Sequence, residues 1–137
     1  MNALVIERGF RAGFRGLRES HGYVVQHLIE DERTISEIGE RMRVSQQAAS
    51  KAIAELVALG YVEVEPADDR RQRCVRLSDR GWAAVRFARR TRRHIEARLR
   101  KAAGSSQYDD AKRIVLTCLD ALGGLGAVRS RRVREPR

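Results

Sequence analysis

Two patterns that would place a protein in or across a membrane are missing from this sequence. No apolar run approaches the roughly 18 residues that a membrane-spanning helix requires. The first residues, MNALVIERGFRAGF, do not form a secretory signal, because Glu7 and Arg8 interrupt the apolar segment and no small-residue cleavage site follows. We therefore expect a cytoplasmic protein with no membrane partner.

Cysteine and histidine are scarce, with two and three residues in a chain of 137. Cys74 and Cys118 lie far apart, and in a cytoplasmic chain both are expected to be packed thiols rather than a disulfide. Neither residue type shows the close spacing of metal ligands. The sequence also contains no Ser-His-Asp set, paired carboxylates or glycine-rich phosphate loop. We expect no metal, no cofactor and no enzymatic activity.

Aromatic residues make up only 5% of the chain, which leaves few side chains for stacking on unpaired bases. Positive charge, by contrast, is abundant. Lys and Arg number 28 against 18 Asp and Glu, which gives a formal net charge of +10. Most of the basic residues are arginine, whose planar guanidinium suits paired contacts with phosphate. The balance predicts a polyanionic partner, with nucleic acid ahead of an anionic membrane.

Apolar residues make up 42% of the chain, enough for a folded core, and they recur at helical spacing in its first third. They predict a first helix over about 3–18 and a shorter one within 22–32. A third helix over 34–42 begins with a capping box, in which Thr34 precedes Glu37 by three residues. The apolar residues of the first helix are Ile6, Phe10, Phe14 and Leu17.

A fourth helix is predicted over 45–59. Ser45 is its N-cap candidate, and Gly60 is placed to end it in the left-handed conformation. Only a turn of two or three residues separates this helix from the one over 34–42. Two helices joined in this way are typical of a helix-turn-helix motif.

The pattern changes to that of strands after the fourth helix. Residues 61–65 and 74–78 alternate and contain β-branched residues, and the segment PADDRRQR between them has the composition of a turn. Two strands around an arginine-rich loop predict a β-hairpin. A hairpin in this position is the wing of a winged helix-turn-helix domain.

Two more helices are predicted after the wing. Ser78 caps a long helix over 78–103, GSSQ interrupts the chain, and a last helix covers 108–122. Residues 124–137 are punctuated by glycine and basic, which indicates a loose tail. Near-heptad spacing on the last helix is typical of a contact between helices. The residues at this spacing are Tyr108, Ala111, Val115, Cys118 and Leu122.

The expected fold is mainly α with a small β-hairpin wing (α+β). A winged helix-turn-helix domain covers 21–80, and the helix over 78–103 links it to the rest of the chain. Helical dimerisation regions at 1–20 and 104–123 flank this core, because the terminal helices carry more apolar surface than one small winged helix needs. The residues expected at the dimer interface are Phe10, Phe14, Val115, Leu119 and Leu122.

The fourth helix has two chemically different sides. One side is apolar, and the opposite side carries amide, hydroxyl and ammonium groups near the N-terminus. Gln can form paired hydrogen bonds with an adenine edge, Ser can donate or accept, and Lys reaches guanine or phosphate. We predict that this side reads base edges in a major groove, and a solvated helix face is the alternative. The predicted contact residues are Ser45, Gln46, Gln47, Ser50 and Lys51.

The predicted wing carries arginine at its tip. Arg70, Arg71 and Arg73 lie in or beside the turn, where they can enter a narrow minor groove of high negative potential. Asp69 precedes Arg71 by two residues and can hold its guanidinium in position. An exposed turn with mutually cancelling charges is the alternative.

From about residue 21 to residue 88 the chain resembles the MarR-type transcriptional regulators. The helix-turn-helix resemblance centres on Ile38, Gly39, Leu56, Gly60 and Val62. The wing pattern Asp-x-Arg-x-x-x-Val-x-Leu-Ser/Thr-x-x-Gly occurs as Asp69, Arg71, Val75, Leu77, Ser78 and Gly81. The positions that depart from the family's usual residues are Ala49, Ala52, Val57 and Leu59.

The resemblance implies a sequence-specific regulator, most often a repressor, that binds an inverted repeat in double-stranded DNA as a homodimer. It places Gln46, Gln47, Ser50 and Lys51 at base-contacting positions, with Arg71 as the minor-groove arginine that Asp69 orients. Small anionic or aromatic effectors, or cysteine oxidation, control relatives of this kind.

The candidate effector pocket lies near the junction of the first two helices and comprises Arg18, His21, Tyr23 and His27. Capping or packing is the alternative role for its two histidines. Cys74 has arginine neighbours that favour a thiolate, but a packed thiol is the expected role.

Two other classes of function fit parts of the sequence. The charge and the basic tail also suit an RNA- or ribosome-associated winged helix, and a wing can serve as a protein-interaction module. The arginines in the middle of the long helix suit phosphates or a solvated face. They are Arg89, Arg90, Arg92 and Arg93.

Overall fold

The computed structural model describes residues 2–66, 73–124 and 126. It confirms a mainly helical fold with a small antiparallel sheet. The helices are α1 (Asn2–Arg11), α2 (Glu19–Leu28), α3 (Ile35–Met42), α4 (Gln46–Ala58), α5 (Asp79–Ala103) and α6 (Ser105–Ala121). The strands are β1 (Arg33–Thr34), β2 (Val62–Pro66) and β3 (Arg73–Leu77).

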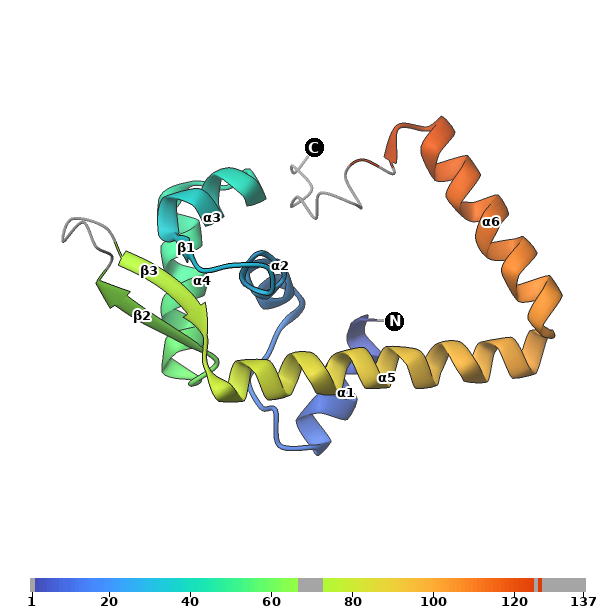
Figure 1. Ribbon diagram of the computed structural model, residues 1–137, viewed down its shortest axis with the longest axis horizontal. Coiled ribbons are helices and arrows are strands. Elements are labelled where there is room, and N and C mark those ends of the chain that lie inside the picture. Colours follow the sequence, from blue (N-terminus) through green and yellow to red (C-terminus); the bar gives the residue numbers. More distant parts are fainter. Residues whose placement is uncertain (1, 67–72, 125, 127–137) are drawn as a thin grey trace.

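Figure 1 shows a lobe at one end of the molecule, formed by α2, α3, α4 and the sheet. We call this part, residues 19–66 and 73–77, the reading lobe. The long helix α5 extends away from it with α1 along its side, and α6 turns back at the far end (Figure 1). No described helix is both long and apolar enough to cross a membrane.

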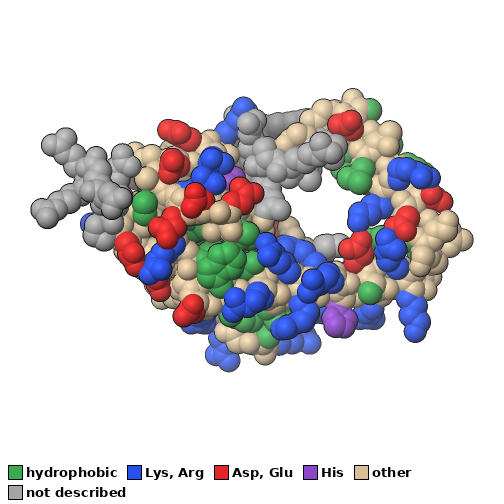
Figure 2. All heavy atoms as spheres, viewed as in Figure 1, with side chains coloured by type: hydrophobic (Ala, Val, Ile, Leu, Met, Phe, Trp, Pro, Cys, Tyr) green, Lys and Arg blue, Asp and Glu red, His purple; other side chains and the backbone are tan. Residues whose placement is uncertain are grey.

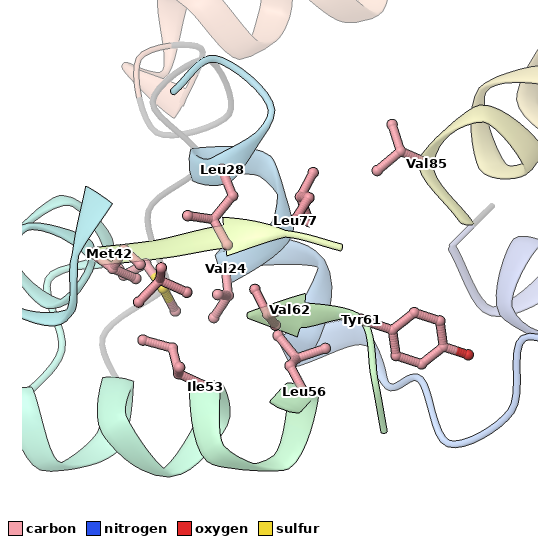
Figure 3. Packing of buried hydrophobic residues seen from close by; sticks show 11 residues of the cluster. Val24, Leu28, Met42, Ile53, Leu56, Tyr61, Val62, Leu77 and Val85 are labelled. Atoms are coloured by element: carbon pink, nitrogen blue, oxygen red, sulfur yellow. The ribbon is translucent and has the colours of Figure 1, made fainter. Parts of the chain in front are cut away.

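The hydrophobic core lies inside the reading lobe and reaches the start of α5. Figure 3 shows side chains from α2, α3, α4 and the sheet converging on one volume. Burial of each such side chain contributes about 1.5–3 kcal/mol. The buried residues of this cluster are Val24, Leu28, Ile38, Met42, Ile53, Leu56, Tyr61, Val62, Val75, Leu77 and Val85.

The two helices of the predicted helix-turn-helix begin and end where their capping residues indicated. Thr34 accepts a hydrogen bond from the Glu37 N–H (3.2 Å), and its own N–H donates to the Glu37 carboxylate (2.7 Å). Ser45 accepts from the Ala48 N–H at 3.2 Å, and Gly60 follows α4 with a φ of 75°. These bonds satisfy amide groups that a helix end leaves without partners.

The first helix is shorter than predicted. It ends at Arg11 instead of continuing to residue 18, because the chain turns where Gly13 and Gly16 adopt φ values of 92° and 79°. Glycine adopts positive φ at much lower cost than residues that carry a Cβ atom. Phe14 and Leu17 still pack against the core, but they do so from the loop, so the apolar spacing continued past the end of the helix.

The sheet has three strands where two were predicted, in the order β1-β3-β2. The predicted hairpin is present, with β2 and β3 antiparallel and Val64 opposite Val75. The additional strand β1 pairs with β3 through Arg33 and Thr34 only. A strand of two residues is too short to show alternating polar and apolar residues in the sequence, so β1 was not predicted. The wing turn at 67–72 lies outside the described residues.

The Ser and Gly of the wing pattern join three elements. Ser78 donates a hydrogen bond to the Gly60 carbonyl (2.7 Å) and accepts one from the Gly81 N–H (3.1 Å), which starts α5. A Cβ atom at position 81 would clash with the backbone carbonyl of Tyr61. The end of α4, the start of β2 and the start of α5 therefore meet at one point.

The connection between the last two helices is tighter than predicted. Gly104 alone separates α5 from α6, and residues 105–107 already belong to α6. Ion pairs of Glu96 with Lys112 (2.8 Å) and of Arg100 with Asp109 hold the two helices together. The tail predicted at 124–137 lies, except for residues 124 and 126, outside the described residues.

Candidate nucleic-acid interface

Helix α4 has an apolar inner side and a polar outer side, as the sequence indicated. Ala49, Ile53 and Leu56 are buried, with exposed fractions of 0%, 2% and 0%. The predicted contact residues all lie on the outer side and are exposed: Ser45, Gln46, Gln47, Ser50 and Lys51. No acidic residue occurs between Ser45 and Lys51, so this surface carries amide, hydroxyl and ammonium groups beside the positive end of the helix dipole.

The small residue at position 49 is explained by the turn. The Val44 N–H donates to the Gly39 carbonyl (3.0 Å), and Arg43 adopts the left-handed conformation with a φ of 54°. A Cβ atom at Gly39 would lie 3.6 Å from the Ala49 Cβ. The two helices approach closely because both positions are small, so alanine at position 49 suits this packing better than a branched residue would.

The wing is held by charge pairs on its exposed side. Arg76 on β3 contacts Glu63 (2.8 Å) and Glu65 (2.5 Å) on β2. The hydrogen bond and charge of Glu65, with a smaller effect of Glu63, raise the pKa of Arg76. Arg73 is exposed at the first position of β3. The other predicted wing residues, Asp69, Arg70 and Arg71, lie outside the described residues.

Charge is unevenly distributed over the surface. In Figure 2, Asp and Glu side chains gather over the sheet end of the molecule, and Lys and Arg gather along the middle of α5. Six arginines of α5 are exposed: Arg80, Arg86, Arg89, Arg90, Arg93 and Arg98. Much of the basic character that the totals indicated is therefore carried by the long helix α5.

A cavity of about 590 Å³ lies between α1, α2 and α5. Ligand pockets in proteins commonly have volumes of this order. Arg18, His21 and Tyr23 of the predicted effector pocket line the cavity, but His27 does not. Its remaining charged lining residues are Glu19, Arg89 and Arg92, and its apolar walls include Val5, Ile6, Phe14, Leu17, Val25, Val85 and Phe87.

Sequence reasoning missed the arginines that α5 contributes to this cavity. Arg92 falls on the same helical face as Val85 and Ile95, which are buried. That spacing was available in the sequence. Because charged residues are expected outside, the arginine-rich segment was interpreted as one solvated or phosphate-binding face.

His21 is almost fully buried, with an exposed fraction of 1%, and it both caps and packs. Its Nδ1 accepts a hydrogen bond from the Arg18 N–H (3.3 Å) at the start of α2. Its Nε2 lies 3.0 Å from an oxygen of Glu55 on α4. Burial, and secondarily the charge of Arg18, lower the pKa of His21, so the ring is neutral at neutral pH.

The predicted dimer residues lie in two different environments. Phe10, Val115 and Leu122 are exposed, with fractions of 57%, 57% and 84%. Leu119 is half-buried. Phe14 faces inward, with its ring 5.2 Å from that of Phe87, so its packing is satisfied within the chain. Further exposed apolar residues near these are Leu4, Leu99, Ile114 and Leu116.

The two cysteines are both free thiols. Cys74 is half-buried on β3, as a partly packed side chain would be. Cys118 is exposed on α6, so the expectation of a packed thiol was wrong for this residue. It lies on a helix in which none of the described residues is fully buried.

Comparison with known proteins agrees with this fold. Residues 15–73 match the sequence model of the MarR family. No curated protein sequence matched the chain significantly.

Solved structures with the same fold include YusO from Bacillus subtilis, with 22% identity, a TM-score of 0.72, and 85% of this chain and 82% of that chain covered. Streptococcus pneumoniae FabT in complex with DNA gives 18% identity, a TM-score of 0.69 and 90% coverage of both chains. A mutant of S. aureus MepR bound to an oligodeoxyribonucleotide gives 14% identity, a TM-score of 0.66 and 88% coverage of both chains. At these identities the likeness establishes the fold.

Proposed function

We propose that this chain is a MarR-type winged helix-turn-helix protein, and that it is a sequence-specific regulator of transcription that binds double-stranded DNA. The exposed polar side of the first turns of α4 carries this proposal. It is supported by the likeness to two proteins whose structures contain DNA. The exposed arginines and the net charge of +10 favour the same partner.

The first two turns of α4 would lie in a major groove. Gln46 and Gln47 offer paired hydrogen bonds to adenine, and Lys51 reaches guanine or a phosphate. A good bidentate contact discriminates by about 1–3 kcal/mol against the wrong base. The alanines on this side, Ala48 and Ala54, allow close approach and offer methyl contacts to thymine.

The wing would enter the neighbouring minor groove. Arg73 is exposed beside the turn, and Arg70 and Arg71 follow from the sequence pattern, with Asp69 as the orienting carboxylate. Such arginines favour narrow, A/T-rich grooves because the negative potential is highest there.

The protein would act as a homodimer. α6 buries none of its residues within the described chain, although Ile114, Val115 and Leu116 are apolar. A surface helix normally covers its apolar stripe, and a second copy of α1, α5 and α6 is the surface that a twofold axis supplies. Two copies of α4 would then reach successive major grooves about 34–36 Å apart on an inverted repeat.

A small anionic or aromatic effector would control binding from the cavity. Its apolar walls and its three arginines, Arg18, Arg89 and Arg92, suit such a compound. The free protein would repress by occupying its operator, and the effector would release it. The effector can do so only by binding more tightly to the protein off DNA than on DNA.

Selection of bound duplexes from a random-sequence pool tests the proposal. The purified protein should enrich an inverted repeat with half-sites about one helical turn apart. Gln47→Ala should weaken binding and relax one base position, and Thr117→Ala on α6 is the matched control away from the interface. Enrichment of a single asymmetric site, or equal competition by structured RNA, would contradict the proposal.

A further inference from the structure

A group of polar contacts joins the cavity wall to the recognition helix. Glu55, the first acidic residue of α4, forms an ion pair with Arg18 and lies 3.0 Å from His21 Nε2. Arg18 and His21 precede Glu55 by more than thirty residues, and both also line the cavity. The same two side chains therefore face the candidate effector site and the DNA-reading helix.

Of the two side chains that contact Glu55, only Arg18 is positively charged. His21 Nδ1 accepts the Arg18 N–H, so the proton of the neutral ring resides on Nε2, from which it is donated to Glu55. The pKa of His21 is lowered by burial and by Arg18. Arg18 is therefore the sole positive charge in this group that compensates the carboxylate of Glu55.

The uncompensated carboxylate would act directly on the proposed DNA contact. Glu55 follows Lys51 by four residues, the spacing at which side chains on a helix are neighbours. Without Arg18, its negative charge would pair with Lys51 and repel the phosphates that approach α4. No movement of the helix is needed for this effect, which depends on charge alone.

An acid in the cavity would compete for Arg18. The cavity also carries Arg89 and Arg92, and Glu19 is its only acidic lining residue within the described chain. An anionic group that enters therefore meets three guanidinium groups. The loop that carries Arg18 is fixed separately, because Tyr61 Oη donates to the Arg15 carbonyl at 3.0 Å. Arg18 can thus exchange one carboxylate for another without the loop being released.

We propose that Glu55 converts occupancy of the cavity into a change of charge on the recognition helix. An apolar acid pairs with Arg18, and Glu55 is left uncompensated beside Lys51, which weakens DNA binding. This inference rests on the proposed DNA-binding function and adds to it the residue through which the effector acts.

We call the proposed effect of Arg18 on DNA binding through the charge of Glu55 the charge relay. A double-mutant cycle on the full-length protein tests it without a ligand. Arg18→Gln should weaken binding to the selected duplex by about fivefold, at the lower end of ordinary coupling between sites. Glu55→Gln should bind at least as tightly as wild type. The double variant should recover the affinity of Glu55→Gln, because the charge that Arg18 compensates is gone.

The ligand arm uses 1-naphthoate as the probe and 1-naphthamide as its uncharged counterpart. Naphthoate should weaken DNA binding by wild type about fivefold and leave Glu55→Gln unaffected, and naphthamide should affect neither. DNA should weaken naphthoate binding by the same factor, because coupling of two binding events is reciprocal. Glu65→Gln, which loses an arginine pair on the wing away from the cavity, should respond like wild type.

Each outcome separates the two proposals. If Arg18→Gln stays weak in the Glu55→Gln background, or if naphthoate acts equally on Glu55→Gln, the charge relay is wrong and the DNA-binding proposal stands. The same conclusion holds if wild type binds the duplex and naphthoate has no effect. If wild type enriches no duplex, the proposed function fails and the relay fails with it.

Discussion

The apolar residues of the reading lobe are buried, whereas those of helix α6 are mostly exposed. In the lobe, Ile53 and Val75 have exposed fractions of 2% and 0%, whereas on α6 and at its end Ile114 and Leu122 have fractions of 60% and 84%. Both regions have a regular apolar pattern in the sequence. The lobe completes its packing within one chain, and α6 does not. Apolar periodicity therefore identifies a helix that must pack, but it does not say which chain supplies the other side.

The largest expected difference between the two regions is in the free energy of unfolding, and Ile53→Ala tests it. Removal of a fully buried branched side chain leaves a cavity in the lobe and should lower the free energy of unfolding by about 2–5 kcal/mol. Urea denaturation followed by circular dichroism measures the change. Ile114→Ala on α6 is the matched control at an exposed position. If both variants lose the same stability at low protein concentration, α6 is covered within the chain and the contrast is wrong.

Val115→Asp should affect assembly and leave the lobe folded. A carboxylate at the centre of the proposed dimer surface would be buried without a partner, and the dimer should weaken by about 2 kcal/mol or more. Sedimentation equilibrium measures the dissociation constant. Thr117→Asp, on another side of the same helix, should dissociate much less. Equal monomer fractions in both variants and wild type would remove α6 from the interface.

The buried histidine makes the stability of the lobe depend on pH in the mildly acidic range. The pKa of His21 is lowered in the folded state, so below the ordinary value of 6.5 the unfolded chain binds a proton that the folded chain does not. Stability should be unaffected by this residue above pH 6.5 and should fall as the pH drops below it, by at most about 1.4 kcal/mol per pH unit.

Urea midpoints between pH 7.5 and pH 5 measure this dependence. His21→Gln is expected to be less stable than wild type at pH 7.5, and the difference should narrow on acidification. His94→Gln is the control, because His94 is exposed on α5. A constant difference between His21→Gln and wild type would show that His21 titrates alike in the folded and unfolded chains.

The parts of the fold that could be predicted from the sequence depend on local chemistry. Thr34, Ser45 and Ser78 cap helices by bonding to amides three residues away, and Gly60 supplies a positive φ. These interactions are encoded within a few neighbouring positions. The helix-turn-helix, the wing strands and the exposed side of α4 follow from them, and all are present.

The parts that could not be predicted depend on contacts between distant segments. Phe14 and Leu17 reach the core from the loop after α1, and β1 exists only through its pairing with β3. The contact of His21 with Glu55 spans 34 residues. Neither residue has a sequence pattern that points to the other, so the link between the cavity and α4 could be found only in the structure.

The smallest effect should come from the ion pairs that hold α6 to α5. Lys112 and Glu96 lie 2.8 Å apart, but their side chains have exposed fractions of 51% and 36%. Their hydrogen bond, and secondarily their charges, raise the pKa of Lys112 and lower that of Glu96, and water and salt screen the charge interaction. Lys112→Gln should therefore change the thermal midpoint slightly at low salt and not at all at about 0.5 M NaCl, where the Debye length is only a few Å.

The double variant with Glu96→Gln should match the single variant, because removal of one partner already ends the pairing. A loss of stability that persists in high salt would mean that α6 is fixed to α5 by packing, and the contrast between a self-contained lobe and a partner-dependent helix would no longer hold.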